Sequence, residues 1–386
     1  MRQLDATEYR AGEAICLAFA LDTLLAEPPA RIHPVALFGR LVAPIDREWR
    51  FPHAVGACAV ATLPLAAAGV AAGAVTVADR LPISPTTIAT ADTAAGRRRC
   101  SLTSDTPSIP GTLLAAGVLF ATTSRRMLTG TARSVVADSE HALPRARREL
   151  RALAGRDSSE LSAGQVRSAA VESTSENLSD GFLAPLLAFA LFAPRSLPAA
   201  AGASAWVKAV NTMDSMLGYR SVPTGWAPAR LDDLIMWLPA RLTAVPLAFA
   251  AGDPTALRRA AAWADEPSSP NAGWPMATLA ALLDVRLEKP GAYVLAPSKD
   301  LPTVAKANAG IAVVERGALL AVLAACLVVA IAPANEKDRS APSSADDRHD
   351  ASRDGQREAS RSVLSSLSGG WSARIRTFLR RWLPWS

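Results

Sequence analysis

Residues 54–78 read AVGACAVATLPLAAAGVAAGAVTVA, a run of 25 residues without a charged side chain. An α-helix needs about 20 predominantly apolar residues to cross the hydrocarbon core of a bilayer. The run is therefore expected to span a membrane as a helix. The alternative, a soluble helical protein in which this helix is buried, fits so long an apolar run poorly.

Other apolar runs extend the same interpretation along the chain. Residues 317–334 hold 18 uncharged residues and residues 106–124 hold 19, and we expect both to be spans. Residues 181–194 and 234–252 are shorter or are interrupted by Arg241, so each fits a buried helix, a tilted span or a re-entrant segment. The predicted fold class is all-α: a polytopic helical membrane protein with cytoplasmic helical segments between the spans.

Composition supports a membrane protein and excludes several other classes. The chain has 386 residues, of which 50% are hydrophobic and 20% charged, and its net charge is +6. This balance is too apolar for an intrinsically disordered or collagen-like chain. The Arg residues are dispersed among acids, so we expect no nucleic-acid partner. The four Cys have no CxxC spacing, which argues against a zinc site and a disulfide framework.

Charge and composition also divide the chain into segments. Residues 125–180 carry nine Arg, and because Arg-rich segments tend to stay on the cytoplasmic side, we place this segment in the cytoplasm. Residues 1–334 are expected to form one integral membrane domain, in which residues 79–110 are a polar, low-complexity insertion. Residues 335–370 are predicted to be a disordered linker. Residues 371–386 are predicted to be a basic amphipathic helix that lies on a membrane surface or packs on the protein.

Polar residues beside apolar runs are the candidates for chemistry, because ionisable groups at membrane depth are costly and tend to be functional. In residues 171–181, VESTSENLSDG, the acids Glu172, Glu176 and Asp180 recur every fourth residue and would line one face of a helix. Three carboxylates on one face repel each other, and Mg²⁺ with phosphate oxygens would relieve that repulsion. The alternative is a solvated helix face paired with Arg. Asn177 could be a ligand, a substrate partner or a helix cap.

Two further motifs repeat this chemistry. Asn211 and Asp214 are three residues apart, again on one helix face, and Arg220 could bind phosphate through its guanidinium fork. Asp232 and Asp233 stand at the entrance of an apolar run, either as a second metal-binding pair or with one of them as a helix cap.

The remaining candidates lie in less specific surroundings. Asn271 and Lys289 belong to a segment punctuated by Pro and Gly, where a binding loop and a capped surface loop are equally consistent. His33 and Arg40 follow the first apolar run of the chain. The sequence has no P-loop, dinucleotide fingerprint or HExxH motif. A nucleoside triphosphate would therefore have to be held by carboxylates, Mg²⁺ and Arg.

Six longer motifs carry a family resemblance. They are LDTLLAEPPARIHPVALFGRLV from residue 21, GRDSSEL from residue 155, AAVESTSENLSDGFLAPL from residue 169, AVNTMDSMLGYR from residue 209, ARLDDLIMWLPARLTA from residue 229 and SPNAGWPMATLAALLDVRLEKPGAY from residue 269. In these motifs, and in their order, the chain resembles the adenosylcobinamide-phosphate synthase family, the CobD/CbiB proteins of cobalamin biosynthesis. The resemblance covers most of residues 17–332.

The resemblance implies a multi-pass enzyme of the cytoplasmic membrane. Such an enzyme joins the propionate carboxyl of adenosylcobyric acid to aminopropanol phosphate, or a related amino alcohol, and gives adenosylcobinamide phosphate. The resemblance implies ATP as cosubstrate and Mg²⁺ as metal. The expected partners are the corrinoid, the amino-alcohol phosphate, the lipid bilayer and other membrane proteins of the same pathway. The amine must lose a proton, which a carboxylate or a His could accept.

The matching motifs assign hypothetical roles to residues of this chain. The expected catalytic groups are Glu172, Glu176 and Asp214. The expected metal ligands are Glu172, Glu176, Asp180, Asp232 and Asp233. The expected substrate contacts are His33, Arg40, Asn177, Asn211, Arg220, Asn271 and Lys289.

The chain departs from the family pattern in one motif, and two other functions stay open. Ala26, Glu27 and Pro28 stand where Gly-Asp-Pro is common, which weakens a role for that acid. A Mg²⁺-dependent membrane transferase acting on a diphosphate substrate would use similar side chains. A transporter would use intramembrane carboxylates to bind a cation or relay protons. The long polar segments 125–180 and 252–310 favour an enzyme.

Overall fold

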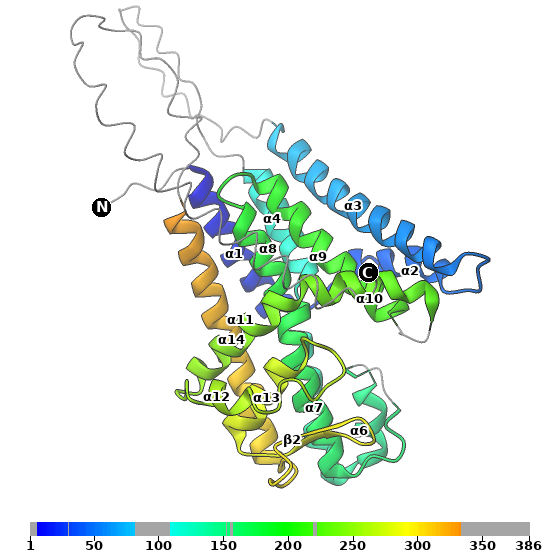
Figure 1. The fold of residues 1–386 in the computed structure, drawn as a ribbon. Coiled ribbons are helices and arrows are strands. Elements are labelled where there is room, and N and C mark those ends of the chain that lie inside the picture. The colour runs from blue at the N-terminus through cyan, green and yellow to red at the C-terminus, as the bar shows by residue number, and fades with distance from the viewer. Residues whose placement is uncertain are drawn as a thin grey trace, which may run out of the picture. The chain divides into compact units, whose positions relative to one another are not determined.

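Helices make up most of the described chain (Figure 1). The computed structural model describes residues 6–29, 31–81, 109–151, 153–154, 157–218 and 222–332. Within them, the strands are β1 (Leu287–Lys289) and β2 (Tyr293–Leu295), which pair as a small antiparallel hairpin. The predicted all-α class is therefore confirmed. The predicted linker 335–370 and amphipathic helix 371–386 lie outside the described residues.

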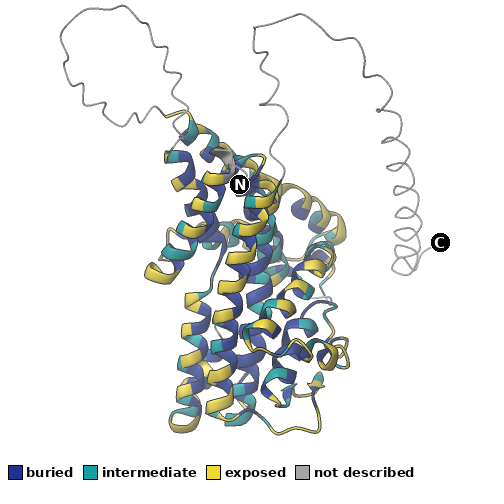
Figure 2. Cartoon of the chain, turned by 90° about the vertical axis from the view of Figure 1, so that its left-hand side faces the viewer, coloured by how far each residue is buried: buried dark blue, intermediate teal, exposed yellow. Residues whose placement is uncertain are grey.

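Two described helices are long and apolar enough to cross a membrane, α3 (Pro52–Asp79) and α14 (Val304–Ile331). Each has 28 residues, and a rise of about 1.5 Å per residue gives a length of about 42 Å, more than the hydrocarbon core requires. Both helices carry exposed residues along one side (Figure 2). Exposed large apolar residues include Val70 of α3 and Leu327 of α14. Such faces suit contact with lipid, and the spans predicted from residues 54–78 and 317–334 are confirmed in length and composition.

A third span was predicted from residues 106–124. The structure has α4 (Ile109–Thr122) there, with 14 residues, which is shorter than the roughly 20 that a span needs. Helices α3 and α4 flank the predicted polar insertion, whose residues 82–108 lie outside the described residues. Polytopic topology and the cytoplasmic side of each segment stay predictions.

In the middle of the fold, a hairpin of two helices reverses the direction of the chain. Helix α7 (Ala163–Leu178) continues through a π-helical turn, η2 (Ser179–Leu183), into α8 (Ala184–Phe192). After a short turn, α9 (Leu197–Leu217) packs back along α8. The C-terminal part of α9 consequently lies beside η2. Residues 181–194, for which the sequence left a buried helix, a tilted span or a re-entrant segment open, thus fall in η2, α8 and the turn that follows it.

Two close contacts position the other helices of this region. Helix α3 packs along α9, and a Cβ added at Gly202 would lie 3.1 Å from the carbonyl oxygen of Ala68. Helices α10 (Trp226–Ile235) and α11 (Trp237–Ala250) are bent by 45° at the break between them, as in a broken span or a re-entrant loop. Residues 234–252 therefore fall on both sides of a bend.

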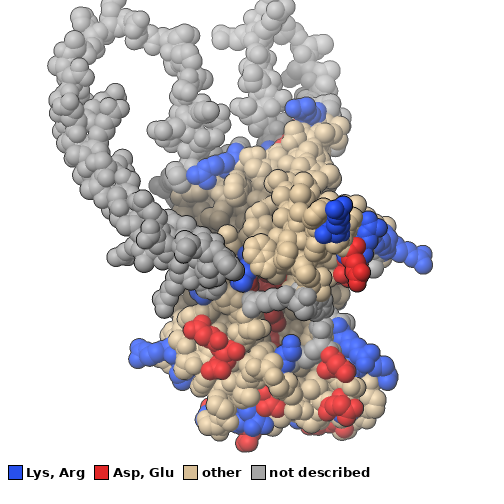
Figure 3. Space-filling view, turned by 45° about the vertical axis from the view of Figure 1, so that its right-hand side comes forward, with Lys and Arg blue, Asp and Glu red and all other residues tan. Residues whose placement is uncertain are grey.

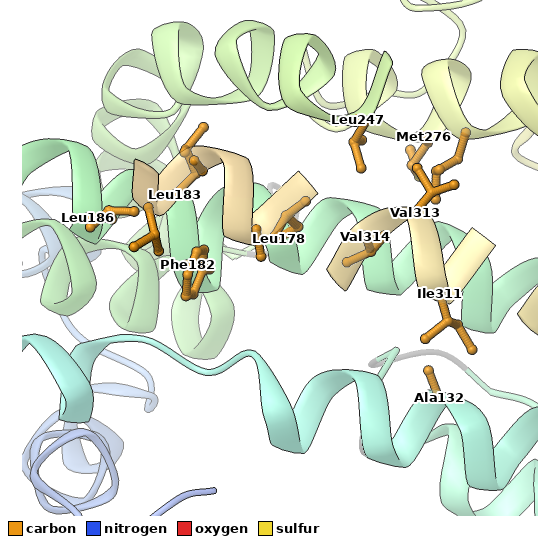
Figure 4. Packing of buried hydrophobic residues seen from close by; sticks show 14 of the residues in the cluster. Ala132, Leu178, Phe182, Leu183, Leu186, Leu247, Met276, Ile311, Val313 and Val314 are labelled. Carbon is orange, nitrogen blue, oxygen red and sulfur yellow. The ribbon is translucent and has the colours of Figure 1, made fainter. Parts of the chain in front are cut away.

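Helix α14 connects the apolar helices with the more polar end of the fold. Figure 4 shows Ile311 of α14 pointing toward Ala132 of α5 (Arg126–His141), and Leu247 and Met276 approaching α14 from the opposite side. All four belong to one buried hydrophobic cluster. Figure 3 shows charged side chains gathered below a face that is largely free of them, at the end where Figure 1 places α6, α12, α13 and the hairpin. The remaining elements are α1 (Ala6–Leu25), α2 (Pro34–Val42), η1 (Ala43–Ile45), α6 (Leu143–Leu150), η3 (Pro223–Gly225), α12 (Ala256–Ala260) and α13 (Gly273–Leu283).

The connection between α1 and α2 contains a strained residue. Ala26 has a φ of 60°, in the left-handed region that costs a residue with a Cβ atom about 1–2 kcal/mol. Replacing Ala26 by Gly removes this strain but adds chain entropy to the unfolded state, so we expect a gain of about 1 kcal/mol or less. Thermal unfolding of detergent-solubilised protein measures the change, and Ala26→Val should lower the midpoint. A lower midpoint for Ala26→Gly would contradict the assignment of strain.

Candidate functional site

A pocket of about 630 Å³ opens between the α1–α2 connection, the end of α4, η2 and α9. Its wall is largely apolar. The polar and charged side chains that line it include Glu27, His33, Ser124, Asn177 and Lys208. Concave sites with an apolar wall and a few converging polar groups are the usual form of small-molecule sites. Of these five residues, the sequence predicted His33 and Asn177.

A buried carboxylate fixes one side of the pocket. Asp22, near the end of α1, is fully buried. It accepts hydrogen bonds from the backbone N–H groups of Arg125 and Arg126, at 3.1 and 3.2 Å, and from Nε of Arg125 at 3.0 Å. The preceding residue, Ser124, donates its backbone N–H to the carbonyl oxygen of Gly181 and its hydroxyl to Glu27. Three segments distant in sequence therefore meet at Ser124.

His33 caps α2 and presents one nitrogen to the pocket. Its Nδ1 accepts a hydrogen bond of 3.1 Å from the backbone N–H of Val35. Its Nε2 lies 3.9 Å from Oε2 of Glu27 and has no hydrogen-bond partner among the described residues. Burial lowers the pKa of His33; Glu27 opposes this shift and Lys208 adds to it. The ring is thus favoured in its neutral form, with the hydrogen on Nε2.

Lys208 connects the pocket with a group of acids. Burial lowers its pKa, while the negative charges of Asp180 and Glu27 oppose this shift. Lys208 was not predicted from the sequence because it stands alone in an apolar helix. A usable signal was its spacing, since Lys208, Asn211 and Asp214 follow each other at three-residue intervals on α9.

The acids of three predicted motifs come together beside Lys208. Burial raises the pKa of Asp180 to about 7, and the nearby charges of Glu176 and Asp214 act in the same direction. Asp232 of α10 interacts electrostatically with Asp180 and Asp214. The Asn211 side chain also interacts with the Asp232 carboxylate. The site therefore draws carboxylates from α7, η2, α9 and α10, and we call Glu176, Asp180, Asp214 and Asp232 the acidic cluster.

The donor chemistry of the acidic cluster suits a divalent cation that also binds phosphate. Asp232 is 8% exposed, and its Oδ1 has no hydrogen-bond partner among the described residues. Mg²⁺ commonly uses only one or two protein carboxylates, together with water and substrate phosphates. Within the described residues, no group of three or more His, Cys, Asp or Glu is placed to hold a metal by itself. The predicted ligand role of the cluster therefore stays a prediction.

Glu172 does not belong to this cluster, although the sequence grouped it with Glu176 and Asp180. It is fully buried, and its carboxylate accepts hydrogen bonds of 2.6 Å from both Ser168 and Tyr293. Eight residues of helix separate it from Asp180, which is about 12 Å of rise. One ion is not expected to bind both carboxylates, so Glu172 is separated from the other two predicted ligands, Glu176 and Asp180. Glu172 instead joins α7 to β2.

The other predicted site residues lie elsewhere. Asn271 is buried and donates to the backbone oxygen of Asp233 at 2.8 Å, which ties its loop to α10. The Asp233 carboxylate lies 3.8 Å from Arg230. Lys289 is exposed on β1 and Arg40 is exposed in the last turn of α2. Arg220 lies outside the described residues.

Comparison with known proteins identifies the family. The family model of the CobD/CbiB proteins matches residues 15–330 of this chain. The chain belongs to the CobD/CbiB family. The match extends over every residue of the pocket and the acidic cluster, so the resemblance carried by the six motifs is confirmed.

Relatives in this family share about a third of their residues with the chain. A protein of Methanothrix thermoacetophila named as a probable cobalamin biosynthesis protein CobD is 31% identical over 329 residues, which cover 84% of this chain and 98% of the relative. The cobalamin biosynthesis protein CobD of Rhodobacter capsulatus is 34% identical over 288 residues, covering 72% of this chain and 82% of the relative. No solved structure matches the chain.

The contact between Glu172 and Tyr293 is expected to stabilise this CobD/CbiB protein. Tyr293→Phe removes a donor from a fully buried carboxylate, which should cost about 1–3 kcal/mol. Thermal unfolding in detergent measures the loss, and Tyr9→Phe is the matched control because Tyr9 is exposed. Equal midpoints for the two variants would show that the hydrogen bond contributes nothing.

Proposed function

We propose that this protein forms an amide bond in cobalamin biosynthesis. The propionate carboxyl of adenosylcobyric acid is joined to aminopropanol phosphate, or a related amino alcohol, with ATP consumed. Family membership supports a role in cobalamin biosynthesis. The observation that carries the finer proposal is the convergence of the family motifs on one pocket with a basic group, a buried His and an adjoining acidic cluster.

The chemistry requires that the carboxyl be activated first. A carboxylate is a poor acylating agent, and transfer of the γ-phosphoryl group of ATP converts it to an acyl phosphate and ADP. The amine then attacks the carbonyl carbon, forms the C–N bond and displaces inorganic phosphate. Positioned opposite charge is the main means by which proteins assist phosphoryl transfer. Lys208, at the boundary between pocket and acidic cluster, is placed to supply such a charge.

One or two carboxylates of the acidic cluster, together with water and substrate phosphate oxygens, would hold Mg²⁺. When bound, the ion supplies charge neutralisation for phosphate oxygens. The pocket volume of about 630 Å³ is ample for an amino-alcohol phosphate. The far larger corrinoid would extend only its propionate arm toward the site.

Membranes that bear the protein test this proposal directly. They are supplied with adenosylcobyric acid, aminopropanol phosphate, ATP and Mg²⁺, and the corrinoid product is followed by mass. We expect a product larger by the condensed amine phosphate, which is lost when ATP is omitted. If neither the phosphate nor the free amino alcohol gives a product with correctly inserted protein, the diphosphate transferase and the transporter become the better assignments.

Glu176 provides a point test within the acidic cluster. Replacing Glu176 by Gln removes one charge next to Asp180 while keeping the side-chain shape, so the protein should remain folded in the membrane. Amide formation should fall by roughly 100-fold or more, the size of effect expected for a preorganised charge at a reacting phosphate. Glu160→Gln is the control because Glu160 is exposed. Activity of Glu176→Gln equal to that of the control removes Glu176 from the site.

A further inference from the structure

The pocket contains a carboxylate to which no role has been assigned. Glu27 follows the strained Ala26, and its side chain is 21% exposed. Its Oε1 accepts the hydroxyl hydrogen of Ser124, which fixes the orientation of the carboxylate. Its Oε2 faces Nε2 of His33 at 3.9 Å and accepts no hydrogen bond from the described residues. One oxygen is thus held by the protein, and the other is left for a ligand in the pocket.

The geometry of His33 decides which of the two groups can accept a proton. Because Nδ1 of His33 accepts the backbone N–H of Val35, the hydrogen of the neutral ring sits on Nε2. A ring in this tautomer can only donate toward the pocket. Burial favours this neutral form by lowering the pKa of His33, while Glu27 opposes the shift and Lys208 adds to it. Glu27 is therefore the proton acceptor of the pair, and His33 a hydrogen-bond donor to it or to a substrate oxygen.

We propose that Glu27 binds the ammonium group of the amino-alcohol substrate and accepts the proton that this group must lose before it can attack. The inference rests on the proposed function and assigns the amine end of the substrate to the pocket. Lys208, the cation assigned above to the reacting phosphate, lines the same pocket and interacts electrostatically with Glu27. The pocket thus offers a negative charge, that of Glu27, to an ammonium group and a positive charge, that of Lys208, to a phosphate group.

The three hydrogens of the substrate ammonium group have three different destinations. The substrate ammonium gives one proton to the Glu27 carboxylate, which exposes the nitrogen lone pair. The nitrogen then bonds to the carbonyl carbon of the acyl phosphate. The bond between the carbonyl carbon and the bridging oxygen of the acyl phosphate breaks. Inorganic phosphate leaves with the electron pair of that bond and with a second proton from nitrogen. The amide keeps the third hydrogen, and Glu27 returns its proton to solvent.

Two amines of different basicity separate this role from others. Aminopropanol phosphate is largely protonated at neutral pH and needs a base. Hydroxylamine is largely unprotonated at neutral pH, so it can intercept the same activated carboxyl as a hydroxamate without help from Glu27. Membranes bearing the wild type, Glu27→Gln, Glu27→Asp or Glu48→Gln are assayed with each amine, and both products are followed by mass. Glu48 is exposed and outside the pocket, which makes Glu48→Gln the matched control.

Glu27→Gln should lose amide formation with aminopropanol phosphate by roughly 100-fold or more, the usual contribution of a general base. Its hydroxamate formation should stay within about twofold of the wild type, which also shows that the variant is folded and activates the carboxyl. The residual amide formation of Glu27→Gln should rise about tenfold per pH unit below the pKa of the amine, because only the free amine reacts. Glu27→Asp, which retains a carboxylate, should recover part of the lost activity.

Three results would overturn the inference. Amide formation by Glu27→Gln at the wild-type rate would show that no base is needed at this position. Equal loss of amide and hydroxamate would place Glu27 in carboxyl activation or in folding. A wild type that makes neither product would reject the proposed function, and this inference with it. The wild-type sample is therefore sufficient to tell failure of the proposed function from failure of the role assigned to Glu27.

Discussion

The pocket depends on the burial of Asp22. A carboxylate without solvent is tolerated only when it is paired and hydrogen-bonded, and leaving such a charge without its partner costs about 3–5 kcal/mol. Asp22 meets this requirement with Arg125 and the backbone of Arg126. Arg126 also donates to the carbonyl oxygens of Thr23 and Leu24, which end α1. These hydrogen bonds of Asp22 and Arg126 fix α1 against the start of α5. They also place Ser124 between Glu27 and η2.

The acidic cluster opposes folding, and the helical hairpin is what keeps it assembled. Like charges brought together in a partly buried site raise each other's pKa, as Asp180 shows. The antiparallel course of α8 and α9 forces Asp214 back beside Asp180, and close packing of α9 on α3 at Gly202 holds that arrangement. Lys208 offsets only part of the repulsion. Helix packing therefore holds together carboxylates that repel each other, and a bound cation would relieve this repulsion. Such arrangements are typical of functional sites.

Features set by local sequence were predictable, and those set by tertiary contact were not. The candidate spans α3 and α14 were predictable from the length of their uncharged runs alone. The four-residue spacing of Glu172, Glu176 and Asp180 predicted a shared helix face, but not that Tyr293, 121 residues away from Glu172, would take that acid into a structural contact. Lys208 was not predicted because it stands alone in an apolar helix, where no period marks it. Glu27 was considered, but its departure from the family pattern was taken to weaken a role for it.

Residues 26–28 depart from the family pattern but still place a carboxylate, that of Glu27, in the pocket. A Gly in the first position adopts a left-handed φ without strain, and Ala26 retains that conformation at a φ of 60°. Glu27 keeps the carboxylate on a side chain one methylene longer than Asp, and this reach brings one oxygen to Ser124 and the other toward His33. One carboxylate thus meets two groups of the pocket, so an acid in an atypical motif can still belong to the candidate site.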